Sequence, residues 1–115
     1  MITMCVQIKY TSEAMTAIFS TGDNRKEAIS SLADQAGGKL ISFYGMQGQH
    51  YHMMIIVEMP SMANWLAFFS KGMSGGAIEE YKNIQLIDPE IIADSSEIFK
   101  GMDYRAPGQW LLKTQ

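Results

Sequence analysis

The 115-residue chain has few of several features on which small proteins commonly depend. Its single cysteine, Cys5, excludes an internal disulfide and favours a reducing compartment. No apolar stretch reaches 18 residues, so we expect no segment to cross a membrane. Charged residues make up only 18% of the chain, the formal net charge is −3, and Lys and Arg do not cluster. The sequence therefore lacks the basic face on which nucleic-acid binding depends.

The chain also lacks the marks of a secretory signal peptide, because its first residues run directly into a strand-like pattern. We therefore expect a cytoplasmic protein that binds neither nucleic acid nor a membrane. Its length and its 47% hydrophobic content suit one globular domain. A core of this size can form without a disulfide or a metal, and we expect no cofactor.

Hydrophobic periodicity predicts a strand over residues 2–10, two strands joined by a turn within 37–59, and a fourth strand over 77–87. Each predicted helix follows a residue that can cap its first turn and stops at a glycine. These caps and stops are Thr11 and Gly22, Asn24 and Gly37, Ser61 and Gly72, and Asp88 and Gly101. The resulting order, β-α-β-β-α-β with an added C-terminal helix, predicts a split βαβ arrangement of the α+β class.

The stretch over residues 37–59 is the centre of the predicted sheet. Its second strand contains an unbroken apolar run, Met53–Val57. Successive side chains of a strand point to opposite faces, so a continuous run indicates that both faces are covered. The helices of the chain can cover one face. We expect a second copy of the chain to cover the other, in a homodimer or a larger homo-oligomer.

Residues 1–88 are predicted to form the α+β domain, and residues 89–115 a C-terminal helix and tail of the same domain. Four apolar residues of that helix are expected to pack: Ile91, Ile92, Ile98 and Phe99. The tail adds further large apolar side chains: Tyr104, Trp110, Leu111 and Leu112. Leaving such side chains in water costs free energy, so we expect the tail to dock on a protein surface.

One set of residues, spread over roughly residues 6–88, follows a known pattern. The set is Tyr10, Thr11, Ile18, Ser20, Arg25, Ala28, Gly37, Gly38, Lys39, Phe43, Tyr44, Gly48, Tyr51, Ile56, Val57, Glu58, Met59 and Pro60. With these residues the chain resembles the GYD domain family. The resemblance implies a ferredoxin-like βαββαβ sandwich with a four-stranded antiparallel sheet, paired into a dimeric α/β barrel. It implies no established biochemical activity.

The chain departs from that family at the stretch from which the family takes its name, a Gly-x-Tyr-Asp-type sequence. Here the stretch reads Gly48-Gln49-His50-Tyr51-His52, with an extra residue after the glycine and histidine in place of aspartate. No role of that aspartate can therefore be carried over to this chain. The residues from Asp88 onward lie outside the resemblance.

Seven residues on or near the predicted strands and helices are candidates to line a ligand cleft. They are Tyr10, Tyr44, His50, His52, Met54, Trp65 and Tyr81. Small-ligand pockets combine apolar walls with a few polar groups, which tyrosines, histidines and methionines can supply together. The same tyrosines could equally be core aromatics whose hydroxyls reach the rim of the core.

These candidates support more than one function. The first hypothesis is a homo-oligomeric protein that holds a small organic ligand in an apolar cleft. The alternative is a cofactor-independent oxygenase or isomerase of the dimeric-barrel type, with His50, His52 or Tyr44 as the acid–base group. The sequence leaves open whether the protein is an enzyme, because no acid–base pair with a fixed orienting partner can be named.

A metal site is the remaining hypothesis. His50 and His52 are two residues apart, so on a strand both imidazoles would point to one face and could bind one metal ion. A third ligand could come only from Cys5, Glu58 or Glu80. Histidines near a turn are more often hydrogen-bonded or exposed to solvent, so we expect no metal here.

Overall fold

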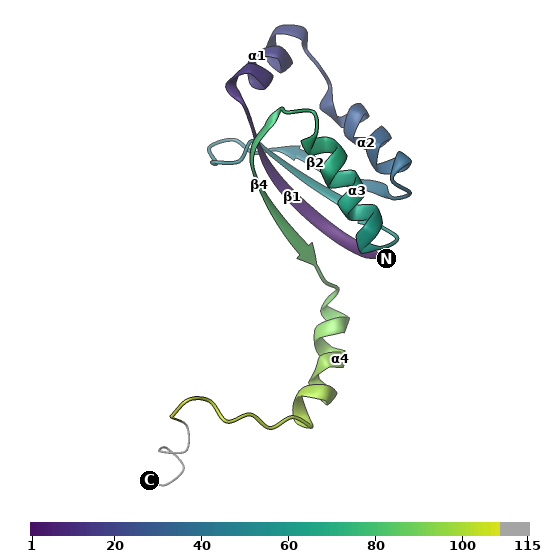
Figure 1. The fold of residues 1–115 in the computed structure, drawn as a ribbon, viewed down its shortest axis with the longest axis vertical. Coiled ribbons are helices and arrows are strands. Elements are labelled where there is room, and N and C mark those ends of the chain that lie inside the picture. The colour runs from purple at the N-terminus through teal and green to yellow at the C-terminus, as the bar shows by residue number, and fades with distance from the viewer. Residues whose placement is uncertain (109–115) are drawn as a thin grey trace.

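The computed structural model describes residues 1–108. Its elements are β1 (Ile2–Tyr10), α1 (Ser12–Thr21), α2 (Arg25–Gln35), β2 (Lys39–Gly45), β3 (Met53–Met59), α3 (Met62–Met73), β4 (Ile78–Leu86) and α4 (Pro89–Lys100). The strands form one antiparallel sheet in the order β2-β3-β1-β4. This order confirms the predicted ferredoxin-like α+β sandwich, and its first connection contains both helices expected between residues 11 and 37 (Figure 1).

The predicted helix starts are confirmed by their capping hydrogen bonds. In each case a side-chain oxygen accepts a hydrogen bond from a backbone N–H of the first turn, and the capping residues are Thr11, Asn24, Ser61 and Asp88. Gly22 ends α1 in the left-handed region, with φ of 66°. The predicted stop at Gly72 is wrong: α3 continues to Met73, because a glycine in ordinary helical conformation does not end a helix.

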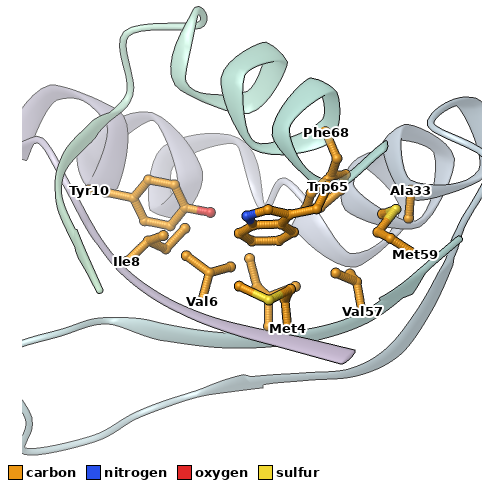
Figure 2. Packing of buried hydrophobic residues seen from close by; sticks show 10 residues of the cluster. Met4, Val6, Ile8, Tyr10, Ala33, Val57, Met59, Trp65 and Phe68 are labelled. Carbon is orange, nitrogen blue, oxygen red and sulfur yellow. The ribbon is translucent and has the colours of Figure 1, made fainter. Parts of the chain in front are cut away.

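Helices α2 and α3 cover one face of the sheet (Figure 1). Alternate residues of β1 and β3 point toward these helices and are buried, as period-two strands predict. Figure 2 shows this core, which includes Met4, Val6, Ile8, Tyr10, Ala33, Val57, Met59, Trp65 and Phe68. The core therefore lies between the sheet and the helices α2 and α3.

The opposite face of the sheet is without a covering helix in the described part of the chain (Figure 1). The strand register places Cys5 between Ile56 of β3 and Ile84 of β4 on this face. Cys5 is only 5% exposed, because its neighbours on both sides shield it. We call the face carrying these three residues the open face. The apolar run of β3 is thus divided, with Ile55 in the core and Ile56 on the open face.

Helix α4 departs from the expected packing. It leads away from the edge strand β4 (Figure 1). Its apolar residues are 54–76% exposed: Ile91, Ile92, Ile98 and Phe99. The expectation that these residues pack is wrong for a single chain, because the helix continues outward from the sheet rather than folding back. Tyr104 is 75% exposed, while Trp110, Leu111 and Leu112 lie outside the described residues.

No helix within residues 1–108 combines the length and the apolar character that crossing a membrane requires.

Candidate functional site

A groove of about 300 Å³ lies between the sheet and the helices α2 and α3. Val6, Ile8 and Ile55 line it from the sheet, and Leu32 and Phe68 line it from the two helices. The volume equals the liquid share of about ten water molecules and lies at the lower end of the range of small-ligand pockets. The groove can therefore hold a small organic molecule against an apolar floor.

Polar groups lie at one end of this groove, where β1 ends and α2 begins. Tyr10 is the last residue of β1 and is 4% exposed. Arg25 opens α2, and its guanidinium is close enough to the Tyr10 phenol for each group to affect the pKa of the other. Arg25 Nη1 also donates to Asp23 Oδ2 at 3.0 Å. A phenol and a cation thus lie together on a largely apolar lining, to which Gln35 and Lys71 add two further polar side chains.

The charge states at this end follow from the surroundings. Burial raises the pKa of the Tyr10 phenol above its usual value of 10, although the nearby Arg25 opposes the shift. Burial by itself lowers the pKa of Arg25, but the contacts with Asp23 and Tyr10 raise it overall. At neutral pH the phenol therefore keeps its proton and the guanidinium stays charged.

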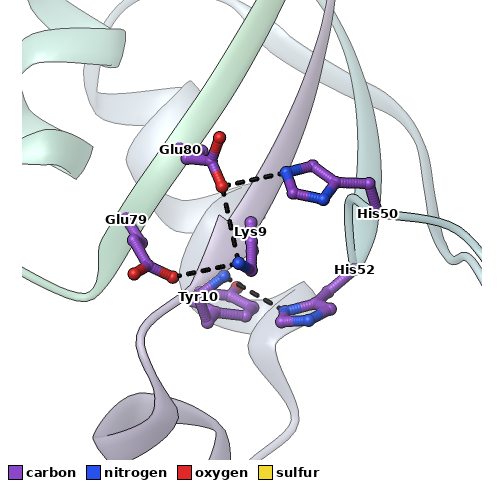
Figure 3. Close-up of polar contacts among 6 residues, drawn as sticks. All are labelled: Lys9, Tyr10, His50, His52, Glu79 and Glu80. Carbon is purple, nitrogen blue, oxygen red and sulfur yellow. Dashed lines mark hydrogen bonds and ion pairs between the residues drawn. The ribbon is translucent and has the colours of Figure 1, made fainter.

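A second polar cluster lies at the rim of the open face (Figure 3). Lys9 Nζ lies 3.4 Å from carboxylate oxygens of both Glu79 and Glu80. His50 Nε2 lies 2.9 Å from Glu80 Oε2. The hydrogen bond to Glu79 is the main cause that raises the pKa of Lys9, and the hydrogen bond to His50 is the main cause that lowers the pKa of Glu80. All these groups are in contact with solvent, so the cluster is a solvated ion-pair network.

His52 has a different partner. Its Nδ1 accepts the backbone N–H of Tyr10 at 3.1 Å, and the two rings are stacked with centroids 6.5 Å apart (Figure 3). The expectation that His50 and His52 share one strand face is wrong, because both lie in a bend that precedes β3. Within residues 1–108, no group of three or more His, Cys, Asp or Glu side chains is placed to hold a metal ion.

The seven candidate cleft residues lie in several places rather than in one cleft. Tyr10 lines the groove, and Trp65 is buried in the adjoining core. Tyr81 stacks edge-on against Phe69, a groove residue, with ring centroids 4.7 Å apart. The remaining candidates are elsewhere. Tyr44 and Met54 pair across β2 and β3 on the open face, and His50 lies at the rim of that face. His52 accepts a hydrogen bond from the backbone of Tyr10.

Arg25 is the functional candidate that sequence reasoning missed. Its position in the helical pattern predicts an outward side chain, yet it lines the groove. One sequence signal could have found it, since a cation in the first turn of a helix is unfavourable next to the positive end of the helix dipole. Such a residue needs another partner, and here the partners are Asp23 and Tyr10.

We expect the replacement His50→Asn to raise the pKa of Glu80 toward its usual value of 4.5. A lowered folded-state pKa stabilises the fold above the unfolded-state pKa, and this contribution is lost as the pH falls through the folded-state pKa. Carbon-detected NMR titration of the Glu80 carboxyl measures the shift. Lys82→Gln removes a β4 charge that makes no ion pair with Glu80 and is the control. An unchanged Glu80 titration in the His50 variant would contradict the assigned contact.

Comparison with known proteins identifies the family of this chain. The GYD domain family matches residues 5–95, which extends the expected region of resemblance into α4. No curated protein matches the chain. Among solved structures, MtbAldR superposes with a TM-score of 0.53 at 15% identity, over 76% of this chain and 52% of that one. The chain thus spans about half the length of MtbAldR.

Two smaller proteins superpose along nearly their whole length. TTHA0845 from Thermus thermophilus has a TM-score of 0.51 at 16% identity, covering 76% of this chain and 95% of that chain. An antibiotic biosynthesis monooxygenase has a TM-score of 0.50 at 12% identity, covering 76% and 98%. At such identities the likeness concerns the ferredoxin-like fold alone. The match over residues 5–95 covers most of the sequence, and the chain belongs to the GYD domain family.

Proposed function

We propose that the protein is a cytoplasmic homodimer of the α/β-barrel type in which each subunit binds a small organic molecule in the groove beneath α2 and α3. The groove carries the proposal: it is about 300 Å³, its floor is apolar, and a few polar side chains border it, with Tyr10 and Arg25 together at one end. Small-ligand sites commonly have this composition, in which apolar walls provide affinity and a few polar groups fix the orientation.

The open face supports the dimer. Its central row, Ile56–Cys5–Ile84, is apolar, whereas a face exposed permanently to water would carry mainly polar side chains. Polar and charged residues, such as Lys9 and Glu80, lie toward its rim. An apolar centre with a polar rim is the usual composition of a protein interface. Two copies packed through this face would form the barrel.

An acid–base reaction by His50, His52 or Tyr44 has weaker support, because none of the three lines the groove. His52 is also occupied by its hydrogen bond from Tyr10. The monooxygenase named above shares the fold, and a shared fold does not carry an activity with it.

Two measurements on the full chain test the proposal. Sedimentation equilibrium at micromolar concentration is expected to give a dimer, and a stable monomer would refute the barrel. Screening by ¹H–¹⁵N NMR with a set of small apolar acids, alcohols and amines is expected to shift the amide resonances of Val6, Ile8 and Leu32. Shifts confined to the open face, or none at all, would refute the groove as the ligand site.

A further inference from the structure

We propose that the ligand of the groove is an organic carboxylate with an apolar body, whose charged end lies among Arg25, Tyr10 and Trp65. The inference rests on the proposed ligand-binding role of the groove and names the chemical class that the groove selects.

The charges around the groove favour an anion. Arg25 and Lys71 line it, and no Asp or Glu does. Asp23 forms an ion pair with Arg25 but does not line the groove. Its side chain is 42% exposed, so solvent weakens this ion pair. Lys71 forms no ion pair within residues 1–108. A ligand with a negative charge therefore meets two cations and no competing carboxylate on the lining.

A buried donor without a partner gives a second, independent argument. Trp65 is only 3% exposed, and within the described range its indole N–H has no hydrogen-bond partner. Trp65 is not on the lining of the groove, but its ring lies against those of Phe68 and Phe69, which are, with centroids 5.8 and 5.6 Å away. Figure 2 shows the indole nitrogen directed toward the hydroxyl of Tyr10, which also lines the groove. An unpaired donor beside the groove favours a ligand whose headgroup can reach it and accept a hydrogen bond.

The hydrogen-bonding roles at this end distinguish between headgroups. An indole N–H and a guanidinium can only donate, and a protonated tyrosine can donate as well. A carboxylate accepts hydrogen bonds at both oxygens and matches this set of donors. An ammonium group would bring further donors and a repelled charge. An alcohol could accept one bond but would leave the guanidinium without a matching charge.

The apolar part of the groove argues against a small inorganic anion. Ile8, Ile55 and Phe68 border the remaining volume, and a phosphate or sulfate would leave these side chains facing empty or water-filled space. A ligand that carries an aromatic ring or a short alkyl chain behind its carboxylate would remove this apolar surface from water.

A matched series of compounds tests the inference: 4-phenylbutyrate, 4-phenylbutan-1-ol and 4-phenylbutylamine, which share one body and differ in the headgroup. Titrations of the full chain followed by ¹H–¹⁵N NMR are expected to show the carboxylate binding at least about tenfold more tightly than the alcohol, with the amine weakest. Equal binding of the alcohol or the amine would overturn the carboxylate class and leave the groove as a ligand site. If no compound shifts the groove resonances, the proposed function fails together with the inference.

Single-donor variants locate the headgroup. Arg25→Gln and Trp65→Phe are each expected to weaken binding of the carboxylate about tenfold and to leave the affinity for the alcohol nearly unchanged. Lys26→Gln is the matched control, because it removes the same charge from the adjacent residue of α2, which does not line the groove. Tyr10→Phe provides a further donor deletion if either variant fails to fold by circular dichroism. Equal carboxylate affinity in the Arg25 and Lys26 variants would overturn the assignment.

Discussion

Replacing Gly38 with alanine is expected to destabilise the fold by about 3 kcal/mol. A Cβ atom at this position would overlap the backbone carbonyl oxygen of Glu58 and the side chain of Met59. Met59 is fully buried, and the Gly38 N–H donates to the Ala33 carbonyl at 2.9 Å, so the end of α2 fixes the chain here. The methyl group could be accommodated only if the backbones of residue 38 and β3 moved apart.

Urea denaturation followed by circular dichroism measures this loss. Gly72→Ala is the matched control, since a Cβ there meets Leu32 Cδ2 at an ordinary 3.8 Å. Gly72 lies inside α3, so alanine is expected to raise the free energy of unfolding by about 0.5–1 kcal/mol. A Gly38 variant as stable as the wild type would contradict this prediction. It would mean that the backbone at residue 38 can move away from Glu58 and Met59 at little cost in free energy.

Local features of this fold could be predicted from the sequence because their causes are local. Thr11, Asn24, Ser61 and Asp88 each cap a helix within three residues of themselves, so a short window contains both partners of the hydrogen bond. The alternation of β1 likewise predicts which residues face the core, and Val6 and Ile8 are buried as expected.

Other features depend on contacts between distant segments, and the sequence could not predict them. Arg25 turns inward because Tyr10 ends β1 beside the first turn of α2, which requires the packed sheet and helices. His50 and His52 diverge because the chain bends before β3 and each imidazole finds a different strand, Glu80 of β4 or Tyr10 of β1. The seven cleft candidates were predicted without knowing which face each strand turns toward the helices.

Helix α4 is an element whose extent could be predicted from the sequence but whose packing could not. Its cap at Asp88 and its stop at Gly101 were predicted, and α4 has the predicted extent. The packing of α4 was not predicted correctly, because the sequence pattern shows that the helix has an apolar face but does not show which surface covers that face. Ile98 and Phe99 are 70% and 76% exposed in the single chain.

The second large effect is expected from Ile56→Asp on the open face. Ile56 lies beside Cys5 in the middle strands of the sheet, so in the proposed dimer its side chain would be buried against the partner copy. An unpaired carboxylate there would cost about 3 kcal/mol or more, and the twofold axis would place two of them in each dimer. The dissociation constant of the dimer is therefore expected to rise at least about 100-fold. Sedimentation equilibrium across a range of concentrations measures it.

The control must add the same charge to the same sheet outside the open face. Asn83→Asp does so, because Asn83 pairs with Val6 on the face that carries the helices and is itself exposed at the edge strand β4. Its dimer is expected to match the wild type. The single subunit leaves the open face uncovered, so the Ile56 variant should keep its circular dichroism spectrum as a monomer. A wild-type dissociation constant in that variant would exclude the open face as the interface, whatever the oligomeric state.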